Sequence, residues 1–240
     1  MKRTPHFNSL SNYMEADWLT AYLHALITES SLPLKAVETD FAVDSSGFST
    51  GRYERWLHAK YGKAQIIDKQ GWIKLHLMCG VKTNIVTSCL VTDKFAGDSP
   101  KFKPLVNKTA ENFVMSEVSA DKAYSSRNNL KLVQSHAAMP YIDFKENANP
   151  ERSKDATWKR LYHFYAYNQD WFYQHYHKRS NVETTFSMIK AKFGGSLRSK
   201  TYQAQMNEAL CKVLCHNICC LVQSIYELGI EPSFWTESAP

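Results

Sequence analysis

The chain has 240 residues, a formal net charge of +6 at pH 7 and a pI of about 8.9. Its 44 % hydrophobic and 22 % charged content is ordinary for a globular protein of one large domain or two small ones. No apolar run approaches the ~20 residues that cross a bilayer, and residues 1–9 lack the apolar stretch of a signal peptide. We therefore expect a cytoplasmic protein without membrane contact. The excess of Lys and Arg favours a polyanionic partner, although solvated surface explains any single basic cluster equally well.

Six cysteines are present, and four of them crowd into one predicted helix: Cys211, Cys215, Cys219 and Cys220. This spacing is not that of a disulfide framework or of a zinc ribbon. A metal site built from Cys215, His216 and Cys219 is one interpretation. We favour the other, in which these cysteines are small buried apolar side chains in a reducing compartment.

The first predicted element is a helix over 18–27, which ends near Pro33, so residues 1–35 form a short N-terminal helical segment. A strand follows over 37–44 and stops at the turn signal Ser45-Ser46-Gly47. Asp44 then lies at the carboxyl end of an apolar strand, where an acid suits a site better than a core. Asp40, on the same face, is its rival, and a role as a turn cap is the alternative for Asp44.

Two further strands are predicted over 71–80 and 85–92, and short links make the three strands an antiparallel meander. Residues 52–61 connect the first strand to the second. We assign His76, on the polar face of the second strand, to packing.

The following segments alternate between helix and strand. A helix over 98–110 precedes a short strand that leads into Asp121, and Ser125 or Ser126 caps a helix over 127–135. A fifth strand covers 139–144, and Pro140 places it at a sheet edge.

The last third of the chain begins with an aromatic and basic connector over 145–170. Its rings either stack on exposed bases or pack the connector onto the body, and we favour packing. A helix over 176–190 and a core-facing helix over 203–228 follow, and residues 229–240 form a tail.

The predicted helix 176–190 places four functional side chains on one stripe, at about 100° per residue. Tyr176, Arg179, Glu183 and Lys190 share this stripe, beside a separate apolar stripe that faces the core. A charged helix surface without function is the alternative.

Asp44, Asp121 and Glu183 are three carboxylates that could share one metal site. If the first and fourth strands are neighbours, Asp44 and Asp121 come together at their ends, and Glu183 projects from a helix rim. Such acids repel one another unless hard cations intervene, and Mg²⁺ prefers carboxylate oxygens. Two ions about 4 Å apart assist phosphoryl transfer. Arg179 and Lys190 would hold phosphates, and Tyr176 could position one.

These features resemble the catalytic domain of insertion-sequence transposases of the DDE type. The resemblance covers roughly residues 36–225 and rests on Val43–Phe48, Trp72–His76, Ala120–Ser126 and the Tyr-Arg-Glu-Lys signature of Tyr176, Arg179, Glu183 and Lys190. It implies an α/β, RNase H-like domain over 36–228, with a mixed five-stranded sheet flanked by helices. The first three strands would be antiparallel, and the last two parallel to the first.

The resemblance also implies a function. Asp44, Asp121 and Glu183 would bind two Mg²⁺ ions, for which Mn²⁺ substitutes, and Tyr176, Arg179 and Lys190 would bind DNA. The enzyme would cut the terminal inverted repeats of an element and join them to target DNA, as a homodimer, in a prokaryotic cell near the nucleoid. Fewer than forty residues precede the first catalytic strand, whereas relatives carry a sizeable N-terminal region, so the chain would be either a natural short form or a truncated one. The alternatives are a metal-dependent DNA nuclease and a catalytically incompetent DNA-binding remnant.

Overall fold

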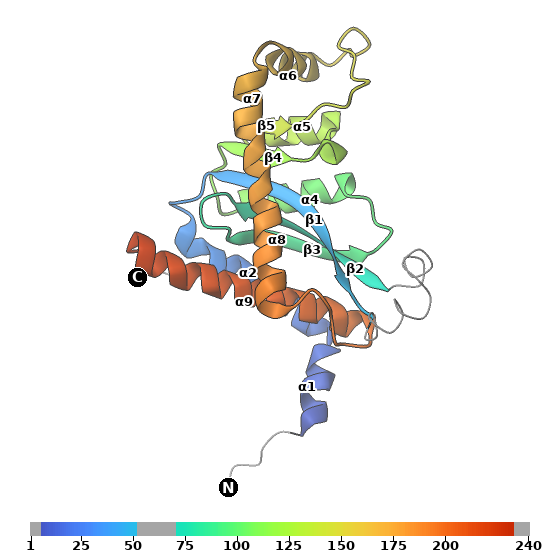
Figure 1. The fold of residues 1–240 in the computed structure, drawn as a ribbon, viewed down its shortest axis with the longest axis vertical. Coiled ribbons are helices and arrows are strands. Elements are labelled where there is room, and N and C mark those ends of the chain that lie inside the picture. The colour runs from blue at the N-terminus through green and yellow to red at the C-terminus, as the bar shows by residue number, and fades with distance from the viewer. Residues whose placement is uncertain (1–5, 52–70, 233–240) are drawn as a thin grey trace, which may run out of the picture.

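The computed structural model describes residues 6–51 and 71–232, and Figure 1 shows the arrangement of its elements. The predicted connector over 52–61 lies outside these residues. The strands are β1 (Asp40–Ser49), β2 (Trp72–Gly80), β3 (Val86–Asp93), β4 (Glu117–Ala120) and β5 (Met139–Ile142). The α-helices in the described residues are α1 (Phe7–Met14), α2 (Asp17–Ser31), α4 (Ser99–Ala110), α5 (Arg127–Ser135), α6 (Ala156–Tyr167), α7 (Gln169–Tyr176), α8 (Ser180–Phe193) and α9 (Tyr202–Leu228). Short 3₁₀ turns are η1 (Leu32–Leu34), η2 (Lys122–Tyr124) and η3 (His177–Arg179).

The five strands form one mixed sheet in the order β3-β2-β1-β4-β5. Strand β2 pairs antiparallel with both β1 and β3, whereas β4 is parallel to β1 and β5 is parallel to β4. This order confirms the predicted RNase H-like sheet. It also confirms the edge position of β5, where Pro140 can lack an amide hydrogen without breaking the interior of the sheet.

The two faces of the sheet bury separate cores, because successive side chains of a strand point to opposite faces. Phe41 and Val43 of β1 pack in the core beneath α4 and α5. Ala42 and Phe48 pack in the other core, with α8, α9 and α2. Helix α2 lies beside α9 and adds Leu23 and Ile27 to that second core (Figure 1).

Strand β1 is longer than predicted. The turn expected at Ser45-Ser46-Gly47 is wrong, because these residues pair with His76, Leu75 and Lys74 of β2. Pairing with β2 satisfies their backbone groups and outweighs their low strand propensity. A Cβ added at Gly47 would lie 2.9 Å from the Trp72 ring, so a larger residue there would require that ring to shift. Asp44 therefore lies within β1, although it still marks where the pairing with β4 stops.

The predicted continuous helix 176–190 is also only partly right. Helix α7 ends at Tyr176, the 3₁₀ turn η3 follows, and α8 begins at Ser180. A 3₁₀ turn has about 3.0 residues per turn instead of 3.6, so the four signature residues do not lie on one regular stripe.

The aromatic connector over 145–170 is largely helical and packs as expected. Trp158 and Phe172 are buried, and the Phe144 and Trp158 rings meet edge to face with centroids 5.5 Å apart. Tyr167 and Trp171 remain exposed.

Helix α9 corrects the expectation that no segment is apolar enough to span a membrane. Among the described residues it is the one helix with that length and composition, and 44 % of its apolar window is buried. A core helix has the same properties, and α9 packs on α2, β2 and β3. All six cysteines are free thiols, but Cys215 is exposed, so burial does not account for every one of them.

A buried amide fastens α9 to the rest of the fold. Asn217 donates to the Val86 carbonyl at 2.8 Å and accepts from the Val86 N–H at 2.9 Å. It also donates to Ser30 Oγ at 3.0 Å. One side chain therefore ties together α9, β3 and α2.

We predict that Asn217→Ala lowers the free energy of unfolding by about 2–4 kcal/mol, since it leaves buried backbone groups unpaired. Urea denaturation followed by circular dichroism measures this change. The control is Gln223→Ala, an exposed position on the same helix, which should stay within about 0.5 kcal/mol of the wild type. Equal effects of the two substitutions would contradict the assignment.

Candidate active site

Three aspartates follow directly after paired positions of the parallel strands. Val43 of β1 is aligned with Ala120 of β4, and Ala120 is aligned with Ile142 of β5. The next residues along the three chains are Asp44, Asp121 and Asp143, which we call the acidic row. The parallel register therefore brings together acids that are far apart in sequence.

Asp143 was missed by the sequence analysis. The predicted strand 139–144 placed it inside an element, whereas β5 ends at Ile142. A signal was present, because Ile142-Asp143 repeats the pattern of an apolar strand residue followed by aspartate seen at Val43-Asp44 and Ala120-Asp121. One Oδ atom of Asp143 is buried without a hydrogen-bond partner among the described residues.

Four residues before the acidic row, the same strands carry a second pair of acids. Asp40 and Glu117 are register partners on β1 and β4, and we call them the paired row. Lys178 of η3 donates to Asp40 at 2.8 Å and to Glu117 at 2.7 Å. His175 Nδ1 lies 2.7 Å from the other oxygen of Glu117. Asp40, the rival of Asp44, is thus held in an ion pair.

Arg179, the residue after Lys178, lies beside the acidic row. Its guanidinium lies 2.8 Å from Glu183 Oε1 and 3.7 Å from Asp44 Oδ2. The Tyr176 ring lies 5.8 Å from Arg179 Cζ. Asp44 Oδ1 also accepts the Ser45 N–H at 2.8 Å, and Asp121 Oδ1 accepts the Lys122 N–H at 2.6 Å. The structure therefore gathers Tyr176, Arg179 and Glu183 beside the acidic row.

The charges of these acids act on one another. Burial raises the pKa of Asp44, the Ser45 N–H and Arg179 partly oppose this, and the charges of Asp121 and Glu183 raise it further. Burial also raises the pKa of Asp143, and the Asp121 charge adds to the shift. The pKa of Tyr176 rises through burial, with Asp121 and Asp143 contributing. Negative charge is therefore in excess here.

The donor set fits a hard divalent cation, because every candidate ligand is a carboxylate oxygen. The geometry is not that of a closed metal site. Within residues 6–51 and 71–232, no three His, Cys, Asp or Glu side chains already surround one ion-sized point. The same finding covers the alternative group of Cys215, His216 and Cys219 as well as the acidic row with Glu183. At the acidic row, the Arg179 guanidinium lies where it neutralises both Asp44 and Glu183.

Lys190 lies farther along β1 than the other predicted DNA-binding residues. Its Nζ donates to Ser46 Oγ at 2.7 Å and lies 5.4 Å from the centre of the Phe48 ring. Burial lowers its pKa. The structure thus places Lys190 beside the extension of β1 beyond Asp44.

Two hollows in the surface differ in their relation to the acidic row. An open concavity of about 500 Å³ is bounded by Asp121 itself and by residues that follow β4 and β5. Its lining residues are Asp121, Lys122, Ala123, Lys145, Glu146 and Asn147. Two lysines, Lys122 and Lys145, stand here beside two carboxylates, Asp121 and Glu146.

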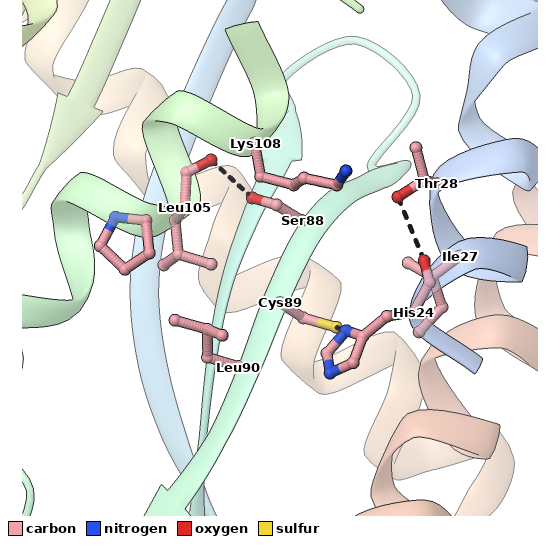
Figure 2. A pocket seen from close by; sticks show the side chains of 9 residues that line it. His24, Ile27, Thr28, Ser88, Cys89, Leu90, Leu105 and Lys108 are labelled. Atoms are coloured by element: carbon pink, nitrogen blue, oxygen red, sulfur yellow. Dashed lines mark hydrogen bonds between the residues drawn. The ribbon is translucent and has the colours of Figure 1, made fainter. Parts of the chain in front are cut away.

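The other hollow, of about 280 Å³, lies between α2, β3 and α4 and shares no lining residue with the acidic row (Figure 2). Cys89 Sγ lies 3.9 Å from His24 Nδ1 there. Burial raises the pKa of the Cys89 thiol to about 12, so this Cys-His pair does not supply a thiolate nucleophile at neutral pH.

The sheet order and the acidic row together define an RNase H-like α/β domain with a carboxylate site. Residues 35–218 match the family model described as the transposase DDE domain, so the chain belongs to that family. A solved structure titled as a piggyBac transposase synaptic complex with hairpin DNA is similar at 11 % identity and a TM-score of 0.48. That similarity covers 81 % of this chain and 49 % of the other, so this chain spans about half the length of that transposase chain.

The raised pKa of Asp44 predicts a cost to stability. A carboxyl group whose pKa is higher in the folded protein than its ordinary 3.8 destabilises the fold increasingly as the pH rises through that interval. Asp44→Asn should therefore be more stable than the wild type at pH 7, and the difference should shrink as the pH falls toward 4. Thermal melts between pH 7 and pH 4 measure this difference.

Asp40→Asn is the matched control, on the same strand and face. It loses an ion pair with Lys178, so we expect a melting temperature at or below that of the wild type at pH 7. A lower melting temperature for Asp44→Asn than for the wild type at pH 7 would show that Arg179 outweighs burial.

Proposed function

We propose that this protein is a transposase that cuts DNA strands and joins them at the ends of an insertion sequence. The observation that supports the proposal is the acidic row with Glu183, a group of four carboxylates of which Arg179 pairs with two, Asp44 and Glu183. Such an excess of negative charge is costly to the fold and useful to an ion-dependent enzyme. Membership of the transposase DDE domain family points the same way.

The proposed roles follow from position. Asp44, Asp121 and Glu183 would hold two Mg²⁺ ions, with Mn²⁺ as a substitute. Bound ions of this kind activate the attacking oxygen and stabilise the leaving oxygen in phosphoryl transfer. Arg179 neutralises Asp44 and Glu183 before ions bind, and Glu183, which is about half exposed, is free to turn from Arg179 toward an ion.

DNA is the proposed substrate, as terminal inverted repeats and as target. The net charge of +6 favours a polyanion. Tyr176 and Arg179 beside the acidic row, and Lys190 along β1, would position phosphates on the strand being cut. Lys122 and Lys145 would hold phosphates in the concavity next to Asp121. Two element ends must meet during transposition, so we propose a homodimer in the synaptic complex.

The decisive experiment incubates the full chain with Mg²⁺ or Mn²⁺ and DNA that carries the inverted repeats flanking its gene. Joined products would support a transposase. Nicks without joining would identify a metal-dependent nuclease. Salt-sensitive binding without any cutting would identify a DNA-binding remnant.

We predict that Asp44→Asn, Asp121→Asn and Glu183→Gln each slow DNA cleavage by at least about 100-fold, because each removes a proposed ion ligand. DNA affinity should stay within a few-fold of the wild type, as measured by fluorescence anisotropy. Asp40→Asn is the control, since Lys178 neutralises that acid, and it should cut DNA at nearly the wild-type rate. Normal cleavage by any of the three variants would remove that residue from the site.

We also predict that Lys190→Ala and Lys122→Ala weaken DNA binding across sequences. Each loses one phosphate contact, so the slope of log affinity against log salt should become less steep by about 1. Lys108→Ala, on α4 at the hollow of Figure 2, is the matched control and should leave the slope unchanged. An unchanged slope for Lys190→Ala would assign that lysine to packing on Phe48.

A further inference from the structure

A second group of polar side chains lies on the opposite face of the sheet from the acidic row. Ser45 follows Asp44 on β1, so its side chain points to that opposite face. Its N–H donates to Asp44 Oδ1 at 2.8 Å, and its Oγ donates to Asp98 Oδ1 at 2.7 Å. One residue therefore links the Asp44 carboxylate to Asp98.

Two residues of β2 complete this group. Lys74 Nζ donates to the same Asp98 oxygen at 2.9 Å, and His76 Nδ1 lies 3.5 Å from it. His76 is aligned with Ser45 in the β1–β2 pairing and is fully buried. Its Nε2 lies 2.9 Å from Thr92 Oγ1. The predicted packing role of His76 is therefore incomplete, since Nε2 has a polar partner, although Nδ1 makes no hydrogen bond among the described residues.

The charge state of the group is settled by its surroundings. Burial lowers the pKa of His76 to about 4, so the ring is neutral at pH 7. Burial alone would raise the pKa of Asp98, but the hydrogen bonds from Lys74 and Ser45 outweigh it and hold that pKa below its usual range. Asp98 is thus an ionised acceptor of hydrogen bonds from Ser45 and Lys74.

The side chain of Asp98 does not play the helix-capping role that is common at its position. It is the N-cap residue of α4, where an aspartate usually accepts a hydrogen bond from the first turn of the helix. Its side chain makes no such cap and turns to the sheet instead. Burial raises the pKa of Tyr124, and the charges of Asp44 and Asp98 add to the shift. The Asp98 side chain therefore accepts a hydrogen bond from β1, the strand that carries Asp44, and none from the first turn of its own helix.

We propose that Asp98, held by Lys74, is a positioning residue that orients the Asp44 carboxylate through Ser45. The proposal rests on the proposed function, in which Asp44 is an ion ligand. The Ser45 hydroxyl anchors the peptide whose N–H holds Asp44 Oδ1, so the carboxylate presents its other oxygen in a defined direction. Loss of such support for a ligand commonly weakens metal binding by about 10–100-fold.

The test measures Mn²⁺ binding by electron paramagnetic resonance of the free ion. Ser45→Ala removes the anchor but keeps the backbone N–H, and it should raise the Mn²⁺ dissociation constant about 10–100-fold. Ser45→Thr restores the hydroxyl on a residue that strands accept, and it should restore binding. Ser49→Ala, on the same strand and face, is the matched control and should bind Mn²⁺ as the wild type does.

Coupling between the two residues gives a second readout. Asp98→Asn should weaken Mn²⁺ binding, and the double variant with Ser45→Ala should be no weaker than the more affected single variant, because both break one link. Asp98→Asn removes the carboxylate that pairs with Lys74, which keeps its hydrogen bond to the Ala96 carbonyl at 3.1 Å. If this variant does not fold, the comparison of Ser45→Ala with Ser45→Thr still tests the proposal.

The possible failures are distinguishable. Wild-type Mn²⁺ affinity in Ser45→Ala, together with its loss in Asp44→Asn, would overturn the positioning role and leave the proposed function intact. Full additivity in the double variant would also overturn it. A wild-type protein that binds no Mn²⁺, or an Asp44→Asn variant that binds normally, would overturn both proposals.

Discussion

Repulsion among carboxylates at the ends of three parallel strands is the constraint on which this site depends. The register of β1, β4 and β5 places Asp44, Asp121 and Asp143 side by side, and α8 adds Glu183. Backbone pairing sets these positions, so the acids cannot move apart without loss of the sheet. The fold must supply compensating charge, and Arg179 supplies part of it. A protein that retains such an arrangement pays in stability for its chemistry.

In the paired row, on the same strands, both carboxylates have ion-pair partners. Asp40 and Glu117 lie four residues before the acidic row, about 13 Å away along a strand. Lys178 bonds both acids, and His175 takes the remaining Glu117 oxygen. Consecutive residues of η3 thus contact different rows: Lys178 pairs with the paired row, and Arg179 pairs with Asp44 of the acidic row. The 3₁₀ turn is where α7 and α8 divide, and it directs the two cations to different places.

The extension of β1 past Asp44 connects the two faces of the sheet. Pairing with β2 continues to Ser49 after pairing with β4 has ended. On one face this leaves the acidic row open to Arg179 and the concavity beside Asp121. On the other face it brings Ser45 to Asp98, Lys74 and His76. Asp44 Oδ1 accepts the Ser45 N–H, while Oδ2 lies 3.7 Å from Arg179.

The sequence by itself determined the elements whose signals are local. Strand alternation over 71–80, the Ser126 cap of α5 and the apolar face of α9 depend on neighbouring residues, and each agrees with the structure. The family signature in the residues also pointed to Asp44, Asp121 and Glu183 before any coordinates. Tertiary structure alone decided the matters that depend on partners distant in the chain. Pairing with β2 turned a predicted turn at Ser45 into strand, and parallel register added Asp143 to the acidic row. Ion pairing distinguished Asp40 from Asp44. Lys178 of η3 lies 2.8 Å from Asp40, whereas Arg179 of the same turn lies 3.7 Å from Asp44, and the sequence around the two acids does not show this difference.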